Sequence, residues 1–167
     1  MGSGRRLIGG QDADHELAAL GELSRCLLDS SSAIYMEKAG FLRLLGSTVE
    51  LFTIREVVDE TGFTDMPVSL LETGRPAEVS TDLLLIGTAT ELRLPVITED
   101  RKMMRRLDTV DIPFFNALMM LHLLLFRGRI ELSAHAAHLE RLLAVCRYSD
   151  RVRAYGEEVL QAVLKYR

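Results

Sequence analysis

The chain has 167 residues, of which 48% are hydrophobic and 26% charged, with a formal net charge of -4. This length fits one domain with a substantial core, and the negative charge argues against a protein that binds nucleic acid through overall basicity. Two distant cysteines, Cys26 and Cys146, form no CxxC pair, which excludes a zinc-ribbon pattern and indicates reduced thiols in a cytoplasmic protein.

No segment of the sequence is typical of a membrane protein or a secreted one. The N-terminus lacks a basic stretch followed by a long apolar run, and residues 1–10 are predicted to be loose. The apolar run from Phe114 to Phe126 is too short to span a bilayer, so it is interpreted as a core helix. We therefore expect no membrane association.

Apolar runs and helical periodicity alternate along the first half of the chain. A short helix is expected at 14–23 and a buried strand at 26–28, followed by helices through Ile34 and Tyr35 and around 41–45. The second strand is predicted at 49–52, and Thr53 is expected to cap a helix that ends at Thr61 and Gly62. Residues 68–71 suggest an extra strand.

The second half begins with a capped helix, for which Ser80 and Thr81 are the N-cap candidates. Pro95 separates this helix from a short buried strand at 96–98, and a helix is expected at 101–107. A last strand is expected near Val110, then helices at 114–127, 133–145 and 150–166. Strands that alternate with helices indicate an α/β protein with a mainly parallel sheet and right-handed crossovers.

Acidic residues stand where strands end. Asp29 follows the first strand, Asp100 follows the strand at 96–98, and Asp82 is interpreted as part of the inward stripe of its helix with Ile86 and Ala89. In open α/β sheets, ligands bind outside the carboxyl ends of the strands. Glu60 borders the inner stripe of the helix after the second strand, whereas Glu56 points further towards solvent. The four acids Asp29, Glu60, Asp82 and Asp100 are therefore expected at one edge.

Oxygen ligands without His or Cys suit Mg²⁺ or Mn²⁺, and crowded carboxylates are tolerable mainly when a metal ion is present. Each acid also has a structural interpretation: Asp29 as a helix cap, Glu60 as an exposed charge, Asp82 as a helix N-terminal residue, and Asp100 as a turn residue. A basic run follows Asp100 (Arg101, Lys102, Arg105 and Arg106), and it suits either a phosphodiester or a solvated helix face.

Histidines offer a weaker metal signal. His135 and His138 lie three residues apart, but no third ligand is nearby in sequence, so they are interpreted as exposed helix residues. His122, inside the apolar run, is interpreted as a core histidine with its hydrogen bonds satisfied.

Four pieces in the same order resemble the PIN-domain family, the magnesium-dependent nucleases that include the VapC toxins. They are Leu27-Leu28-Asp29-Ser30-Ser31 with Ile34-Tyr35, Ile54 to Glu60, Thr81-Asp82 with Leu85-Ile86 and Ala89, and Val96 to Arg101. The resemblance implies a PIN-like domain at 25–167 that includes the C-terminal helices, after an extension at 1–24 with a short helix. It implies a three-layer α/β/α sandwich.

The resemblance also implies the chemistry of an endoribonuclease. Asp29, Glu60, Asp82 and Asp100 would hold Mg²⁺ or Mn²⁺, Ser31 and Thr98 would orient the carboxylates, and Arg101 and Lys102 would contact the RNA. An antitoxin protein and a homodimer through the helices between 114 and 166 are family expectations.

Two departures from the family pattern bear on these expectations. Arg55 stands where the family usually has Pro, which leaves Glu56 as a rival to Glu60. The helical segment that often lies between the second and third acids is missing, and that segment often holds substrate, antitoxin or a second subunit.

Two other functions compete with the ribonuclease. One is a catalytically silent PIN-like module used for binding or assembly, which metal binding would discriminate. The other is a receiver-like domain with a phosphorylated Asp, which would require a Lys at the end of a late strand, where none is placed.

Overall fold

The structure is a computed structural model that describes residues 12–74 and 78–167, so the prediction for residues 1–10 lies outside the described part. The strands are β1 (Arg25–Leu28), β2 (Glu50–Ile54), β3 (Ser69–Leu71), β4 (Val96–Ile97) and β5 (Phe114–Phe115). The helices are α1 (Ala13–Glu22), α2 (Ser30–Ala39), α3 (Leu42–Gly46), α4 (Arg55–Thr61), α5 (Thr81–Leu92), α6 (Arg101–Thr109), α7 (Ala117–Phe126), α8 (Leu132–Val145) and α9 (Asp150–Lys165).

The strands form one sheet in the order β3-β2-β1-β4-β5, and every strand pair in the described ranges is parallel. β1 lies at the centre, with Cys26 opposite Leu51 of β2 and Leu27 opposite Val96 of β4. The chain winds outward from β1 first through β2 and β3, and then returns to the other side through β4 and β5. The order therefore reverses between β1 and β4.

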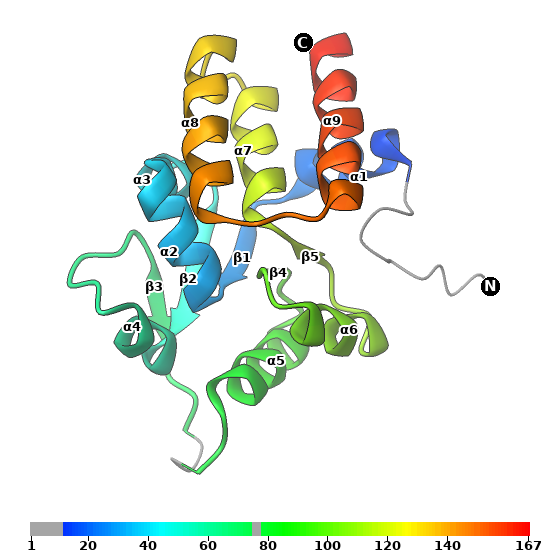
Figure 1. Ribbon diagram of the computed structural model, residues 1–167. Helices are drawn as coiled ribbons and strands as arrows, with labels where there is room; N and C mark the ends of the chain where they lie inside the picture. The colour runs from blue at the N-terminus through cyan, green and yellow to red at the C-terminus, as the bar shows by residue number, and fades with distance from the viewer. Residues whose placement is uncertain (1–11, 75–77) are drawn as a thin grey trace.

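Alternate residues of the central strand contact two different helical layers. Cys26 and Leu28 of β1 belong to the larger cluster of buried residues, with side chains from α1, α2, α3, α7, α8 and α9. Leu27 belongs to the smaller cluster, with residues of α5 and α6. Figure 1 shows these two groups of helices on opposite sides of the sheet. This arrangement confirms the predicted α/β class and the three-layer α/β/α sandwich, because a parallel sheet needs helices on both faces.

Local sequence explains where most helices begin and end. Side-chain oxygens of Asp29, Ser80 and Asp100 accept backbone N–H groups at the first turns of α2, α5 and α6. Gly40 and Gly62 follow α2 and α4 in the left-handed conformation, which glycine adopts at no steric cost.

Three predictions about elements are wrong in detail. Thr53 lies inside β2 and donates a hydrogen bond of 2.7 Å to the carbonyl of Leu28, so α4 begins at Arg55 without a side-chain cap. The last strand is β5 and not a strand near Val110, which is the C-cap of α6. As a result α7 begins at Ala117, because the first apolar residues of the predicted helix pair with β4.

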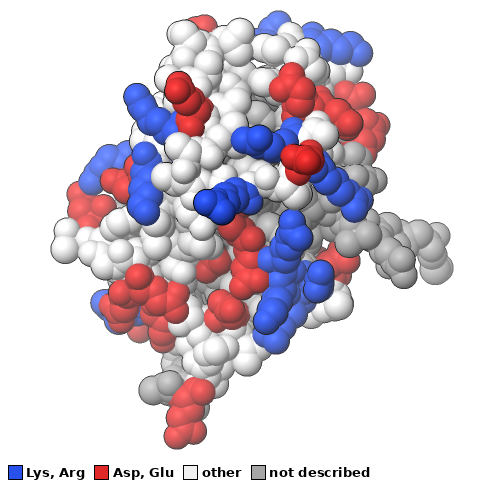
Figure 2. All heavy atoms as spheres, in the orientation of Figure 1, with Lys and Arg blue, Asp and Glu red and all other residues white. Residues whose placement is uncertain are grey.

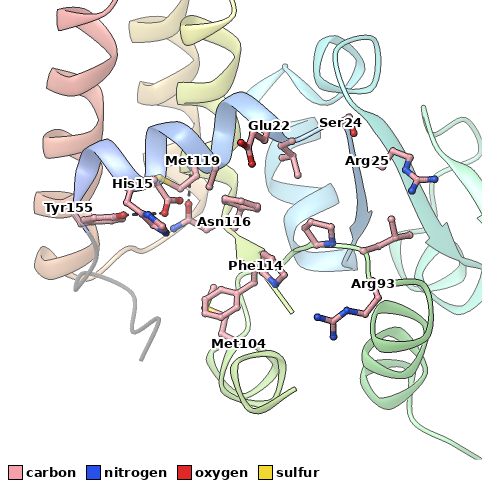
Figure 3. Close-up of a pocket in the computed structure, with 17 residues that line it drawn as sticks. His15, Glu22, Ser24, Arg25, Arg93, Met104, Phe114, Asn116, Met119 and Tyr155 are labelled. Atoms are coloured by element: carbon pink, nitrogen blue, oxygen red, sulfur yellow. Dashed lines mark hydrogen bonds between the residues drawn. The ribbon is translucent and has the colours of Figure 1, made fainter. Parts of the chain in front are cut away.

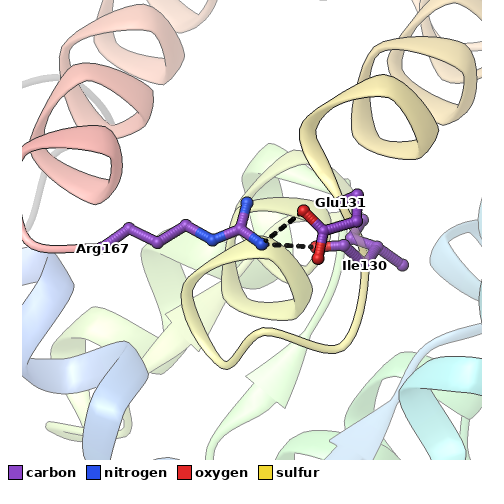
Figure 4. Close-up of polar contacts among 3 residues, drawn as sticks. All are labelled: Ile130, Glu131 and Arg167. Atoms are coloured by element: carbon purple, nitrogen blue, oxygen red, sulfur yellow. Dashed lines mark hydrogen bonds and ion pairs between the residues drawn. The ribbon is translucent and has the colours of Figure 1, made fainter.

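The C-terminal helices complete the larger cluster. Every residue of α7 from Ala117 to Leu125 is buried, and α7 packs against both α8 and α9. Beyond α9, the guanidinium of Arg167 contacts the Glu131 carboxylate at 3.0 Å and the carbonyl of Ile130 at 3.5 Å, which ties it to the start of α8 (Figure 4). In the described residues, no helix combines the length and the apolarity needed to cross a bilayer.

The histidine prediction is wrong for His135. Its side chain is only 1% exposed, and its Nε2 lies 2.9 Å from Nδ1 of His122 on α7. Burial, and then the neighbouring His135, lower the pKa of His122 to about 3, so this ring is neutral at physiological pH. Nε2 of His122 is buried without a hydrogen-bond partner in the described structure, so this core histidine is only half satisfied.

The helix α1 belongs to the same core. Leu17 and Leu20 are buried in the larger cluster, and the Tyr155 hydroxyl of α9 donates a hydrogen bond of 3.2 Å to Glu16. The Arg127 guanidinium after α7 donates a hydrogen bond of 3.0 Å to the carbonyl of Leu20. These contacts hold α1 against α9 and against the C-terminal end of α7.

Candidate functional site

Acidic residues follow β1 and β4 at the point where the strand order reverses. β1 ends at Leu28 and leads directly into Asp29, while β4 ends at Ile97 and leads into Thr98 and Asp100. The two strands are paired, so these residues lie next to each other beyond the same end of the sheet. A strand-order reversal leaves a crevice there because the connecting loops diverge to opposite faces.

Asp29 is the most constrained of the four candidate acids. It is 5% exposed, and its Oδ2 accepts hydrogen bonds from the hydroxyls of Thr98 at 2.8 Å and Ser31 at 3.4 Å. Its Oδ1 accepts the N–H of Ser30 at 2.7 Å, so Asp29 also caps α2. Burial raises the pKa of this carboxyl, and the charge of Asp82 raises it further, while the hydrogen bonds lower it.

Glu60 reaches the same edge from α4. Its Oε2 accepts a hydrogen bond of 2.8 Å from the hydroxyl of Ser30, next to Asp29. The rival Glu56 lies one turn earlier and is half-buried, and its Oε2 has no hydrogen-bond partner in the described structure. Among the described residues, hydrogen bonding therefore connects Glu60, and not Glu56, to the residues around Asp29.

Asp82 does not lie on the buried face of α5, which corrects the inward stripe predicted from the sequence. It is exposed in the first turn of α5, where Ser80 provides the cap, so the helix does not need the Asp82 side chain to begin. Partial desolvation, and then the charges of Asp100 and Glu60, raise the pKa of Asp82, whereas Arg106 lowers it. The charges of two other candidate acids therefore act on the Asp82 carboxyl.

Asp100 has a clear structural role. Its Oδ1 accepts the N–H groups of Lys102 at 2.7 Å and Met103 at 3.3 Å, which makes it the N-cap of α6. Its own N–H donates to the Thr98 hydroxyl at 3.1 Å. Thr98 thus connects the backbone of Asp100 to the carboxylate of Asp29.

The four acids fit a divalent cation in donor chemistry and in charge. All four offer carboxylate oxygens, which Mg²⁺ and Mn²⁺ prefer. Within residues 12–74 and 78–167, none of the four forms a salt bridge with Lys or Arg. The same residues contain no group of three Asp, Glu, His or Cys side chains placed to hold one ion. The acids therefore lie at one edge and act on each other electrostatically, but the described side chains do not form a preorganised set of three ligands.

A basic surface lies beside this edge. The buried side of α6 consists of Met103, Met104 and Leu107, and its exposed side carries the cations of the basic run (Arg101, Lys102, Arg105 and Arg106). Figure 2 shows Lys and Arg side chains gathered over α6, next to acidic side chains at the centre of the same face. The effect of Arg106 on the pKa of Asp82 puts this surface within electrostatic reach of the acids. Such a surface attracts polyanions.

Two residues near the acids were missed by the sequence analysis. The hydroxyl of Ser30 donates to Glu60, whereas the sequence pattern indicates only Ser31 as an orienting hydroxyl. Glu99 accepts the N–H of Ala117 at 2.6 Å and the Tyr148 hydroxyl at 3.3 Å, and burial raises its pKa to about 7. The position of Glu99 between Thr98 and Asp100 was visible in the sequence, but its partners come from distant segments.

Two cavities lie beside the sheet, and Met104 and Asn116 line both of them. One of about 360 Å³ lies beside Glu99, and its lining includes Tyr35, Arg101 and Tyr148. The other, of about 410 Å³, lies beyond the N-terminal ends of β1, β4 and β5, where Arg25, Arg93, Phe114 and Tyr155 contribute to the lining (Figure 3). The first cavity, and not the second, is lined by Glu99 and Arg101, the neighbours of Asp100 in the chain.

Comparison of the chain with models of known protein families finds no match, and comparison with curated proteins and with solved structures finds none. The structure establishes the fold class, and the resemblance to the PIN domain remains a prediction from short motifs.

Proposed function

We propose that this chain is a ribonuclease of the PIN-domain type that depends on Mg²⁺ or Mn²⁺. The observation that supports this proposal most directly is Asp82. Its carboxylate is not the helix cap, and its pKa is raised by partial desolvation and then by the charges of Asp100 and Glu60 from two other elements. Structural roles explain Asp29 and Asp100 as caps, but they do not explain why acids from four elements interact at one edge.

In this proposal Asp29, Asp82 and Asp100, together with Glu60, would hold the cation. The bound ion would supply positive charge for the phosphate group and increase the acidity of a water molecule. The chain's own contribution is positioning. Thr98 fixes the orientation of the Asp29 carboxylate, and Ser30 fixes that of Glu60. Arg101 and Lys102 on the basic surface of α6 would contact the RNA backbone.

The experiment is cleavage of single-stranded RNA by Asp82→Asn in the presence of Mg²⁺ or Mn²⁺. Asn keeps the shape of the side chain and removes its charge, and the exposed position leaves the fold intact. We expect cleavage to be abolished. The matched control is Asp59→Asn, an exposed acid next to Glu60, which should cleave like the wild type. Full activity of Asp82→Asn would refute the role given to this acid.

A second candidate function is a catalytically silent PIN-like module for binding or assembly. The lack of a three-ligand group among the described residues favours it. A metal titration discriminates the two: no binding of Mg²⁺ or Mn²⁺ at millimolar concentration supports the silent module. The resemblance to the family also leads us to propose a role as the toxin of a toxin–antitoxin pair, a cytoplasmic location and homodimerisation through the C-terminal helices.

A further inference from the structure

The cavity beside Glu99 is lined by groups that suit one nucleotide. Its volume of about 360 Å³ is near the lower end of the range of roughly 300–1,000 Å³ that is usual for small-molecule sites. Its lining combines the aromatic rings Tyr35 and Tyr148 with the cations Arg101 and Arg147. Aromatic rings stack on bases of any sequence, and guanidinium groups bind phosphates or stack on bases in turn.

The positions of the two tyrosines are fixed by different elements. Tyr35 lies on α2 one turn after Ser31, so it projects from the same side of the helix as the hydroxyl that contacts Asp29. Tyr148 lies between α8 and α9, and its hydroxyl donates a hydrogen bond to the half-buried Glu99. Both rings are half-buried and pack against the larger cluster. A ring held in this way binds a base with little further loss of conformational entropy.

The cavity is adjacent to the acidic edge. Glu99 lies between Thr98, which contacts Asp29, and Asp100, and the charge of Asp29 acts on Glu99. Arg101 lines the cavity and also begins α6, the helix that Asp100 caps. A strand of RNA on the basic surface of α6 would therefore have both the acids and this cavity within reach of neighbouring nucleotides.

We propose that this cavity binds one unstacked base of single-stranded RNA, with the base against Tyr35 and Tyr148 and its flanking phosphates at Arg101 and Arg147. This inference rests on the proposed function, and it adds how substrate is held. It predicts that the chain acts on single strands, because a base inside a duplex cannot enter the cavity.

The test is the binding of a labelled single-stranded RNA hexanucleotide, measured by fluorescence anisotropy in EDTA so that no metal-dependent cleavage occurs. Tyr35→Ala should weaken binding by about 10-fold, the loss of one stacked base. Tyr35→Phe, which keeps the ring, should bind within about 2-fold of the wild type. Tyr166→Ala, at an exposed tyrosine outside the cavity, is the matched control and should not change binding.

An abasic hexanucleotide separates stacking from an effect on the fold. Removing the base that occupies the cavity should weaken binding of the hexanucleotide to the wild type. Tyr35→Ala should bind the intact and the abasic hexanucleotide equally well. Arg147→Ala gives an independent readout at an exposed residue. It should reduce the slope of the logarithm of the binding constant against the logarithm of salt concentration by about one, the value for one phosphate contact. Arg141→Ala, at an exposed residue of α8, should leave this slope unchanged.

The outcomes distinguish this inference from the ribonuclease. Suppose that metal-dependent cleavage occurs, but that Tyr35→Ala binds RNA as tightly as the wild type and the abasic hexanucleotide binds as tightly as the intact one. The base site is then overturned and the ribonuclease remains. If binding depends on Tyr35 and on the base but no metal ion supports cleavage, the base site is supported and the ribonuclease is refuted.

Discussion

The hydroxyl of Thr98 donates a hydrogen bond of 2.8 Å to Oδ2 of Asp29, although 69 residues separate them in the sequence. Both side chains are buried, and they join the ends of β1 and β4 where the strand order reverses. Asp29 thereby has its orientation fixed by the neighbouring strand, and not only by the helix that it caps.

Thr98→Val should remove this hydrogen bond at nearly constant volume. The buried carboxylate would lose its strongest partner, so we expect a loss of about 1–3 kcal/mol in the free energy of unfolding. We also expect metal affinity to fall about 10–100-fold, since residues that orient a ligand usually have effects of that size. Thr53→Val is the matched control, because the hydroxyl of Thr53 donates a hydrogen bond of 2.7 Å to the carbonyl of Leu28 within the same sheet. It should cost similar stability and leave metal affinity unchanged; equal metal affinities in the two variants would contradict the role of Thr98.

Glu60→Gln and Glu56→Gln decide between the two rival acids of α4. Glu60 accepts a hydrogen bond from Ser30, and its charge contributes to the raised pKa of Asp82, whereas the buried Oε2 of Glu56 has no hydrogen-bond partner among the described residues. We expect Glu60→Gln to reduce Mg²⁺-dependent cleavage at least 10-fold and Glu56→Gln to leave it within about 2-fold, on the scale of ligand-orienting groups. Cleavage assays at several Mg²⁺ concentrations measure both. The opposite order of effects would assign the site to Glu56.

The pair His122 and His135 predicts a loss of stability in acid. The pKa of both rings is lowered by burial, to about 3 for His122, whereas an unfolded histidine titrates near about 6.5. The unfolded chain therefore binds more protons below about pH 6.5, so the contribution of the pair is complete above that pH and is lost progressively as the pH falls towards 3.

Carboxyls with a raised pKa, such as Asp29 and Glu99, change stability in the opposite direction, so the comparison must be between variants. Urea denaturation at pH 7.5 and pH 5 should show a larger loss of stability in the wild type than in His122→Leu. His15→Asn, at an exposed histidine, should follow the wild type. Parallel losses in all three proteins would mean that the buried pair does not control acid stability.

Gly156 allows the close contact between α9 and α7. A Cβ there would lie 2.5 Å from Cδ2 of Leu118, so Gly156→Ala should cost about 1–3 kcal/mol of unfolding free energy. Gly21→Ala in α1 is the matched control, because its Cβ would meet only Phe126 at 3.5 Å. There the higher helix propensity of Ala should stabilise by about 0.5–1 kcal/mol. Thermal or urea unfolding measures both, and equal effects would contradict the packing described.

The sequence predicted the parallel α/β class because its strands are short apolar runs between capped helices, and the three layers were implied by the resemblance. The pattern at Phe114 and Phe115 misled, since these two residues of β5 continue without a break into the apolar helix α7. Thr53 suits a helix cap by its residue type, but its hydroxyl donates instead to the carbonyl of Leu28 on the neighbouring strand. Such a choice depends on a tertiary contact that local pattern does not contain.

The candidate site was predictable to a similar extent. Asp29 and Asp100 follow buried strands, so their edge of the sheet could be read from the sequence. The exposure of Asp82 could not be read from the sequence. Periodicity shows which face of a helix is apolar, but not whether the packed sheet extends as far as the first turn of that helix. His135 looked exposed because its partner His122 is on another helix.

The most direct measurement of the central claim is a Mn²⁺ titration of the wild type and Asp82→Asn, followed by thermal unfolding and by the bound metal. If the four acids share a divalent cation, the wild type should bind Mn²⁺ at millimolar concentration or below, and its midpoint of unfolding should rise with the metal. Asp82→Asn should bind more weakly and show little rise. Absence of Mn²⁺ binding by the wild type, or equal binding by both proteins, would contradict the account.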